Sequence, residues 1–166
     1  MNKAFWLLLF CVLPWAAGAE TNVVFQIGVP DGNYGEFAIA GDYSQYPEKF
    51  PNDANYIVGQ SDPARDWPFI LPGPVDGWAG GKSHDFTIHF QLDGLHGGHQ
   101  ETGYYQLVVD FVSTHDEAPP ELAINVNGGA VRQQLPRGAG GDESLTNPKV
   151  GRPYSLYQLI PASQLH

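Results

Sequence analysis

Cysteine is almost absent from the sequence. The 166-residue chain has one cysteine, Cys11, which lies in an apolar stretch near the N-terminus. The rest of the chain therefore has neither a disulfide nor a thiol nucleophile. Its fold must be stabilised by burial of apolar side chains, and thiol-dependent catalysis is excluded. The region from Glu20 onward is long enough for one domain with its own core.

Basic residues are also scarce. The chain carries 8 Lys and Arg against 18 Asp and Glu, a formal net charge of -10. Such a surface repels nucleic acid backbones and anionic lipid headgroups. We therefore expect no nucleic-acid partner and no membrane partner. A highly charged polyuronate would need a local basic patch or a cation, so a neutral or sparsely charged ligand suits this balance better.

Long apolar runs are missing except at the N-terminus. An unbroken apolar stretch from Ala4 to Val12 follows Lys3, and the small residues Ala17-Gly18-Ala19 come shortly after it. This layout is typical of a cleaved secretory signal, and the run is shorter than the roughly 20 residues of a membrane-spanning helix. We expect residues 1–19 to be a signal peptide, residues 20–166 to form a single domain, and the protein to be secreted, either extracellular or periplasmic.

Helical periodicity is absent as well, whereas short alternations of apolar and polar residues recur between turns. These alternations predict half-buried strands over residues 23–29, 86–92, 105–111 and 122–126 and a strand followed by a short turn over residues 154–165. Half-buried strands need a second sheet to cover them. The predicted fold is therefore all-β, an antiparallel β-sandwich and jelly roll, with long connections at residues 42–74 and 136–153.

The predicted sandwich would normally have a closing strand after residues 154–165, and the sequence supplies none. The expectation is therefore either an open sheet edge, which a partner chain could complete, or a fragment of a longer reading frame.

Six sequence segments are similar to those of a known family: FQIGVPDGNYGEF (25–37), YIVGQSDPARDWPF (56–69), FTIHFQL (86–92), YYQLVVDF (104–111), LAINVNG (122–128) and YQLIPASQL (157–165). In this order they resemble the C-terminal, non-catalytic jelly-roll domain of rhamnogalacturonan lyases of polysaccharide lyase family four. The resemblance implies a galactose-binding-like sandwich that holds carbohydrate. It also implies that the lyase catalytic residues, which lie in another domain of the family, are absent. The implied function is a secreted carbohydrate-binding module for pectic or related polysaccharide, with no catalysis and no cofactor.

Aromatic residues beside planar polar groups suggest where a sugar would bind. A sugar ring stacks its C–H face on an aromatic ring and pairs its hydroxyls with planar polar groups. The predicted carbohydrate-binding residues are Trp67, Trp78, Asp66, Arg65, Tyr43 and Tyr46.

A packing role competes with this interpretation. Trp67 and Phe69 could close the end of the sandwich, with Arg65 paired to Asp62 or Asp66. Trp78, which is flanked by glycines, could be either an exposed stacking platform or part of the core.

The stretch Pro30-Asp31-Gly32-Asn33 is typical of a turn. In the structural interpretation Asp31 accepts backbone N–H groups and Glu36 anchors the loop through buried hydrogen bonds. The alternative is a site for a cation or for sugar hydroxyls. Turn chemistry alone accounts for the residues, so the sequence favours a sheet corner.

A histidine-rich loop offers His89, His96, His99 and Glu101, which are potential metal ligands. The alternative function is therefore a small metal-dependent enzyme, and a second alternative is a structural remnant of a longer lyase. The spacing does not favour the metal, because His96 and His99 flank two glycines and do not lie two residues apart on one strand. A solvated loop is the preferred interpretation, with no metal site.

Overall fold

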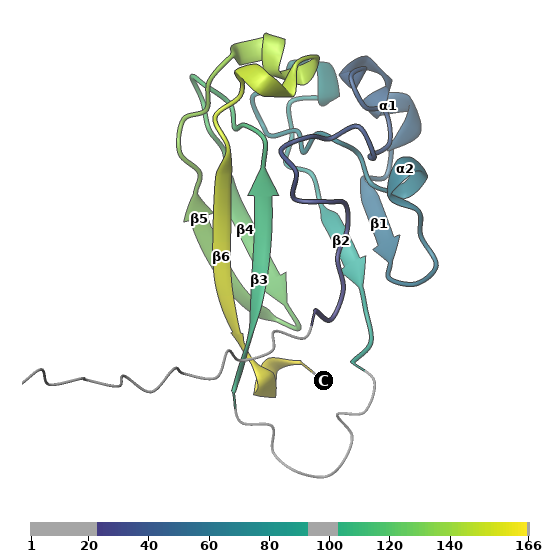
Figure 1. The fold of residues 1–166 in the computed structure, drawn as a ribbon, viewed down its shortest axis with the longest axis vertical. Coiled ribbons are helices and arrows are strands. Elements are labelled where there is room, and N and C mark those ends of the chain that lie inside the picture. The colour runs from purple at the N-terminus through teal and green to yellow at the C-terminus, as the bar shows by residue number, and fades with distance from the viewer. Residues whose placement is uncertain (1–22, 93–102, 166) are drawn as a thin grey trace, which may run out of the picture.

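The computed structural model describes residues 23–92 and 103–165. The expected signal peptide lies outside these residues, as do His96, His99 and Glu101. Within these described ranges, six strands pair as three two-stranded sheets (Figure 1). The strands are β1 (Ala54–Ile57), β2 (Phe86–His89), β3 (Tyr104–Phe111), β4 (Glu121–Val126), β5 (Gly129–Gln134) and β6 (Tyr154–Pro161).

Two antiparallel pairs form the layers of the β-sandwich. β3 pairs with β6 over their whole length, from Tyr104 opposite Pro161 to Phe111 opposite Tyr154. The hairpin of β4 and β5 lies behind this pair in Figure 1. Leu156 and Ile160 of β6 are buried, and alternate residues of β3 and β4 are half-buried. The predictions of strands near 105–111, 122–126 and 154–161 are confirmed.

A tight turn sets the register of the β4–β5 hairpin. Asn127 and Gly128 connect the strands, and both have positive φ angles, 46° and 89°. Two consecutive left-handed residues match the twist of antiparallel strands, and Asn-Gly adopts this geometry readily. The turn explains β5, which the alternation did not predict because most of its residues are exposed.

The third pair departs from the antiparallel arrangement expected for the whole sandwich. β1 and β2 are parallel, with Ala54 opposite Phe86 and Ile57 opposite His89. The connection between them carries α2 (Pro63–Asp66) and the 3₁₀ helix η2 (Gly77–Ala79). The predicted loop over residues 42–74 is therefore interrupted by structure, which also includes η1 (Tyr43–Gln45) and α1 (Tyr46–Lys49).

Short 3₁₀ helices also interrupt the second long connection and end the described chain. η3 (Gly141–Leu145) and η4 (Pro148–Val150) precede β6, and η5 (Ala162–Gln164) follows it. The predicted turn after the last strand is confirmed. No helix in the described ranges is long and apolar enough to cross a membrane.

The prediction of a strand over residues 23–29 is wrong. The backbone there finds local partners: Val29 N–H donates to Glu36 Oε1 at 2.8 Å, and the Gln26 side chain donates to the Gly28 carbonyl at 2.7 Å. Gly28 also has a left-handed φ of 75°, which interrupts an extended run. The apolar contacts survive without strand pairing, because the rings of Phe25 and Phe90 lie 4.9 Å apart.

The opening turn has the predicted hydrogen bonds. Asp31 Oδ1 accepts the Asn33 N–H at 2.9 Å, and Glu36 accepts the Val29 N–H. Asn33 Oδ1 accepts the N–H groups of Tyr34 and Gly35. The predicted partners of Asp31 and Glu36 are confirmed, but the Glu36 hydrogen bond is exposed and not buried as expected.

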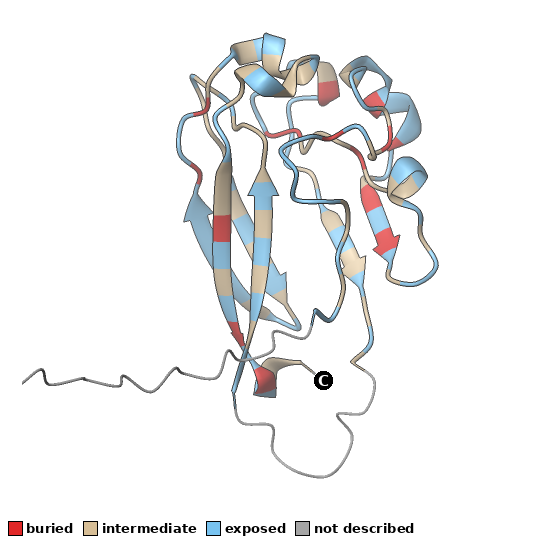
Figure 2. Cartoon of the chain, viewed as in Figure 1, coloured by how far each residue is buried: buried red, intermediate tan, exposed pale blue. Residues whose placement is uncertain are grey.

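A second core lies beside the sandwich, where α1, β1 and η2 meet (Figure 2). Tyr46 is its most buried large side chain, with 1% of its surface exposed. Its ring stacks on Phe50 at 5.5 Å, and Ala38, Ala54 and Ala79 complete the buried cluster. This core supports the segment that carries the predicted carbohydrate-binding residues.

Candidate functional site

The structure divides the predicted carbohydrate-binding residues into two groups. Arg65 and Asp66 lie on α2 with Trp67 directly after it, whereas Tyr43, Tyr46 and Trp78 lie on η1, α1 and η2. Trp67 and Trp78 both pack against the Tyr46 core, so one buried cluster supports both groups.

The first group begins at a capped helix. Asp62 Oδ1 accepts the Ala64 N–H at 3.0 Å, and Pro63 occupies the first turn, where its missing N–H costs nothing. The side chain of Asp66 turns back to accept the Asp62 N–H at 2.8 Å. These bonds hold Asp66 at the helix end and fix the direction of the residues that follow.

Arg65 forms a two-pronged pair with Asp66. Its Nε donates to Oδ1 at 2.8 Å and its Nη2 donates to Oδ2 at 2.7 Å. The hydrogen bonds from Arg65 and from the Asp62 N–H hold the pKa of Asp66 below its usual range. The Arg65 side chain remains 70% exposed. The pair thus offers a rigid, planar set of donors and acceptors to solvent.

Trp67 is half-buried, and it packs edge-to-face against two aromatic rings. It meets Tyr56 at 6.0 Å and 90°, and Phe86 at 6.0 Å and 62°. The predicted packing role therefore has direct support. The Phe69 ring contacts the Tyr34 ring, with the ring centres 4.9 Å apart, and Phe69 directly follows Pro68, which forms an isolated parallel bridge with Ala38.

Trp78 is also half-buried. Tyr43 approaches it edge-on at 5.0 Å, and Tyr46 does so at 6.1 Å. Tyr43 is half-buried too, so these two rings share a boundary between core and solvent. Tyr46 has almost no exposed surface, which leaves it a supporting position behind Trp78 and no contact with a ligand on the surface.

The sequence did not predict a partly buried pair, Asp53 and His84, next to this group. His84 Nδ1 lies 2.6 Å from Asp53 Oδ1, and the His84 side chain is 2% exposed. Asp53 Oδ2 accepts the Asp85 N–H at 3.0 Å. The His84 ring also meets Tyr46 edge-on at 5.3 Å. Only the three-dimensional pairing of β1 with β2 brings Asp53 and His84 together, so no local pattern could have identified them.

Burial of the Tyr46 phenol, together with the nearby carboxylate of Asp53, raises its pKa. The phenol therefore stays protonated at physiological pH. Tyr46 lacks the properties of a general base, and its contacts are those of a core residue.

Metal ligands do not gather in the part of the chain that the structure describes. Within residues 23–92 and 103–165, no group of three His, Cys, Asp or Glu side chains could hold an ion. His89 is exposed at the end of β2. The other three residues of the proposed metal cluster, His96, His99 and Glu101, lie outside the described residues.

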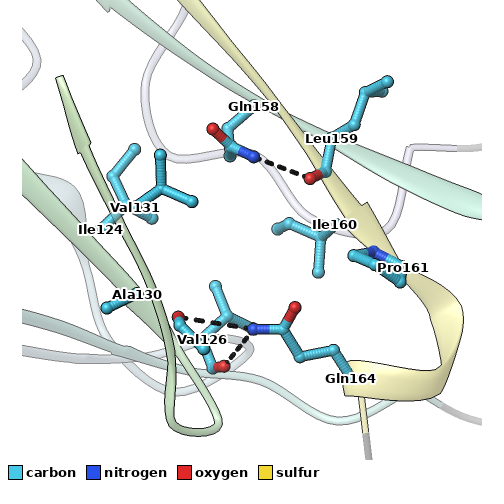
Figure 3. Close-up of a pocket in the computed structure, with 10 residues that line it drawn as sticks. Ile124, Val126, Ala130, Val131, Gln158, Leu159, Ile160, Pro161 and Gln164 are labelled. Atoms are coloured by element: carbon cyan, nitrogen blue, oxygen red, sulfur yellow. Dashed lines mark hydrogen bonds between the residues drawn. The ribbon is translucent and has the colours of Figure 1, made fainter.

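A small hollow opens between the β4–β5 hairpin and β6 (Figure 3). Its volume is about 190 Å³, below the roughly 300–1,000 Å³ of typical ligand pockets. The Gln164 side chain crosses its floor and donates to the Val126 carbonyl at 2.6 Å. Apolar side chains from both layers line it, so it is a gap in sandwich packing and has few groups that could select a ligand.

Comparison with known proteins agrees with the fold. Residues 23–166 match the family described as "CBM-like: Polysaccharide lyase family 4, domain III". A probable rhamnogalacturonate lyase B of Aspergillus flavus is 32% identical over 102 residues, covering 47% of this chain and 15% of the relative. The corresponding Aspergillus niger protein is 30% identical over 101 residues, covering 47% and 14%.

A probable rhamnogalacturonate lyase C of Emericella nidulans is 36% identical over 73 residues, covering 34% of this chain and 7% of the relative. The chain thus matches only a small part of each relative's length. No solved structure matches the chain significantly. The family match confirms the expected β-sandwich and the expected non-catalytic character of the domain. Because the match spans every described residue, the chain belongs to the CBM-like domain III family of polysaccharide lyase family 4.

Proposed function

We propose that this protein is a secreted module that binds pectic or related polysaccharide and carries out no catalysis. The observation that carries the proposal is the match of residues 23–166 to a CBM-like domain. In addition, three relatives that share part of this sequence are probable rhamnogalacturonate lyases. Secretion rests on the signal-like N-terminus of the sequence.

The geometry supports a sugar contact near α2 and η2. Trp67 and Trp78 are supported from behind by the Tyr46 core and keep part of their surface at the boundary with solvent. The Arg65–Asp66 pair adds planar hydrogen-bonding groups next to Trp67. We assign Trp67, Trp78, Arg65, Asp66 and Tyr43 as contacts, with Tyr46 as support.

The charge balance favours a neutral part of the polysaccharide. The net charge of -10 opposes a polyuronate chain, because repulsion acts over about 10 Å at moderate salt. We therefore expect uncharged galactan to bind more tightly than polygalacturonate, and the difference to narrow as salt is added.

Affinity gel electrophoresis and titration calorimetry test the proposal with uncharged pectic galactan, rhamnogalacturonan and polygalacturonate. Trp67→Ala and Trp78→Ala should each weaken binding about tenfold, the equivalent of roughly 1.4 kcal/mol. Trp67→Phe and Trp78→Phe preserve a ring and should lose less. A folded wild-type protein that binds none of the three polysaccharides would overturn the proposed function.

Arg65→Gln gives a test that does not disturb the core, because the Arg65 side chain is 70% exposed. It should weaken binding while leaving the unfolding midpoint at neutral pH nearly unchanged, because an exposed ion pair contributes only about 0–1 kcal/mol. Lys49→Gln is a matched control, because Lys49 is also exposed and lies on α1. Equal affinity of the Arg65 and Lys49 variants would remove Arg65 from the site.

A further inference from the structure

The outward face of the β3–β6 pair is unusual for the solvated side of a sandwich. Four of its side chains are large, apolar or aromatic, and they are exposed: Tyr104 by 71%, Tyr157 by 64%, Leu159 by 56% and Val108 by 42%. Solvated strand faces normally alternate to polar residues. We call the outward residues of these two strands the tyrosine face: Tyr104, Gln106, Val108, Asp110, Ser155, Tyr157, Leu159 and Pro161.

The register places these side chains opposite one another across the two strands. Tyr104 faces Pro161, and Val108 faces Tyr157. Gln106 faces Leu159 between them. Since residues two apart lie on one face, the eight side chains form a continuous strip along the ribbon. The two tyrosines lie about 13 Å apart along the strand direction, because four residues of strand separate Tyr104 from Val108.

The opposite side of the ribbon is the packed one. Figure 3 shows Ile160 pointing into the hollow beside the β4–β5 hairpin and Leu159 pointing away from it. In Figure 1 β4 and β5 lie behind β3 and β6, and no described element passes in front of them. The tyrosine face therefore has no cover within the described part of the chain.

The charge of the tyrosine face favours a neutral ligand over an anionic one. It contains no basic residue, and its one acidic residue, Asp110, accepts a hydrogen bond from Ser155 Oγ. An anionic polymer would find no counter-charge here and would meet the acidic surface of the rest of the chain. A neutral ligand meets no such penalty.

The size of the face argues against a protein partner. A stable protein–protein interface takes roughly 20–30 residues on each side, whereas the tyrosine face is two strands wide. Adjacent strands lie about 4.8 Å apart, so the strip has the width of one extended chain and not of a folded surface. The two separated rings could stack on two sugars of such a chain, while Gln106 and the Asp110–Ser155 pair could bond hydroxyls.

We propose that the tyrosine face is a second glycan-binding surface, distinct from the α2 and η2 region, and that it takes a single extended chain of uncharged polysaccharide along β3 and β6. The inference rests on the proposed carbohydrate-binding function but assigns it to different residues. It makes the domain a two-sited binder, which should hold long polysaccharides more tightly than short oligosaccharides.

The test compares Tyr104→Ala/Tyr157→Ala with Tyr104→Phe/Tyr157→Phe in affinity gels containing uncharged pectic galactan, with Trp78→Ala run beside them. The alanine variant should lose about tenfold or more in affinity, and the phenylalanine variant should stay near wild type because its rings remain. Both tyrosines are exposed, so both variants should unfold with the wild-type midpoint.

Galactan binding that is unchanged in the alanine variant but lost in Trp78→Ala would overturn the second surface and leave the proposed function standing. Wild-type protein that binds no polysaccharide would overturn both. Sedimentation velocity tests whether the tyrosine face binds another copy of the chain. A wild-type dimer that becomes a monomer in Tyr104→Ala/Tyr157→Ala would show such self-association and would also overturn the proposal.

Discussion

Asp53 and His84 form a partly buried pair, with 2.6 Å between Oδ1 and Nδ1, that joins the start of β1 to the segment entering β2. Asp53 directly precedes β1 and has a left-handed backbone with φ of 62°. His84 lies two residues before β2. The pair therefore fixes the start of the parallel register, next to the core that supports Trp78.

Asp53→Asn should destabilise the fold by about 1–3 kcal/mol, because it replaces a charged acceptor of two hydrogen bonds by a neutral group. Asparagine tolerates the left-handed backbone, so the loss reports on the pair and not on strain. Urea unfolding measures it. Asp85→Asn is the control, since Asp85 contributes its backbone N–H to the pair; an equal loss in both variants would contradict the assignment.

Stability should fall when the pH drops below about 4. Burial raises the pKa of Asp53, but the hydrogen bonds from the Asp85 N–H and His84, and the charges of His84 and Lys82, outweigh it and lower the pKa overall. A carboxyl with a lowered pKa contributes stability that is complete above its unfolded value, about 3.9, and lost as the pH falls through the folded value.

The pKa of Asp66 is also lowered, first by the hydrogen bonds from Arg65 and then by the one from the Asp62 N–H. The stability that Asp66 contributes is therefore lost over the same acidic range. Urea unfolding can be measured from about pH 2.5 to about pH 7, the range in which carboxyls titrate. The free energy of unfolding should depend less steeply on pH in Asp53→Asn/Asp66→Asn than in wild type. Profiles of equal slope would show that these two carboxylates are not responsible for the acid sensitivity.

Gly138→Ala should be among the most damaging small substitutions. An added Cβ would lie 1.8 Å from the Thr114 carbonyl oxygen, which is a backbone atom that cannot turn aside. We expect a loss of about 3 kcal/mol in unfolding free energy. Gly77→Ala is the matched control, because a Cβ there meets nothing within 4 Å. Similar midpoints for the two variants would refute the close approach.

Glu36 offers a direct test of the opening turn. Glu36→Ala removes the acceptor of the Val29 N–H and should cost about 1 kcal/mol, whereas Glu36→Gln retains an acceptor and should cost less. Thermal unfolding with calcium and with chelator decides between the two interpretations. A melting temperature raised by calcium in wild type, but not in Glu36→Gln, would favour the cation site over the anchor.

The sequence predicted the strands that combine alternation with a buried partner. β3, β4 and β6 each bring half-buried residues against the other layer, so their pattern reflects the core. β1 was missed because it is four residues long and pairs in parallel with a distant strand. The prediction over residues 23–29 failed because Glu36, seven residues beyond Val29, takes the N–H that a strand would share.

The candidate site was predicted in part. The pairing of Arg65 with Asp66 follows from adjacency, and the structure contains it. The exposure of each aromatic residue depends on the tertiary fold: Tyr46 and Tyr43 lie in the same short segment, yet one is buried and the other reaches the boundary with solvent. Val108, on the otherwise polar side of its strand, was one local sign of the tyrosine face.

The long separation between β3 and β6 also has a kinetic consequence. The β4–β5 hairpin is closed by two residues and can form in about 1–10 μs. β3 and β6, in contrast, are separated in sequence by the hairpin and by η3 and η4. Non-local pairing of this kind slows folding. We expect amide protection to develop in the hairpin before it does in β6, which pulsed hydrogen exchange during refolding would reveal, so the ribbon that carries both tyrosines is the last part of the sandwich to assemble.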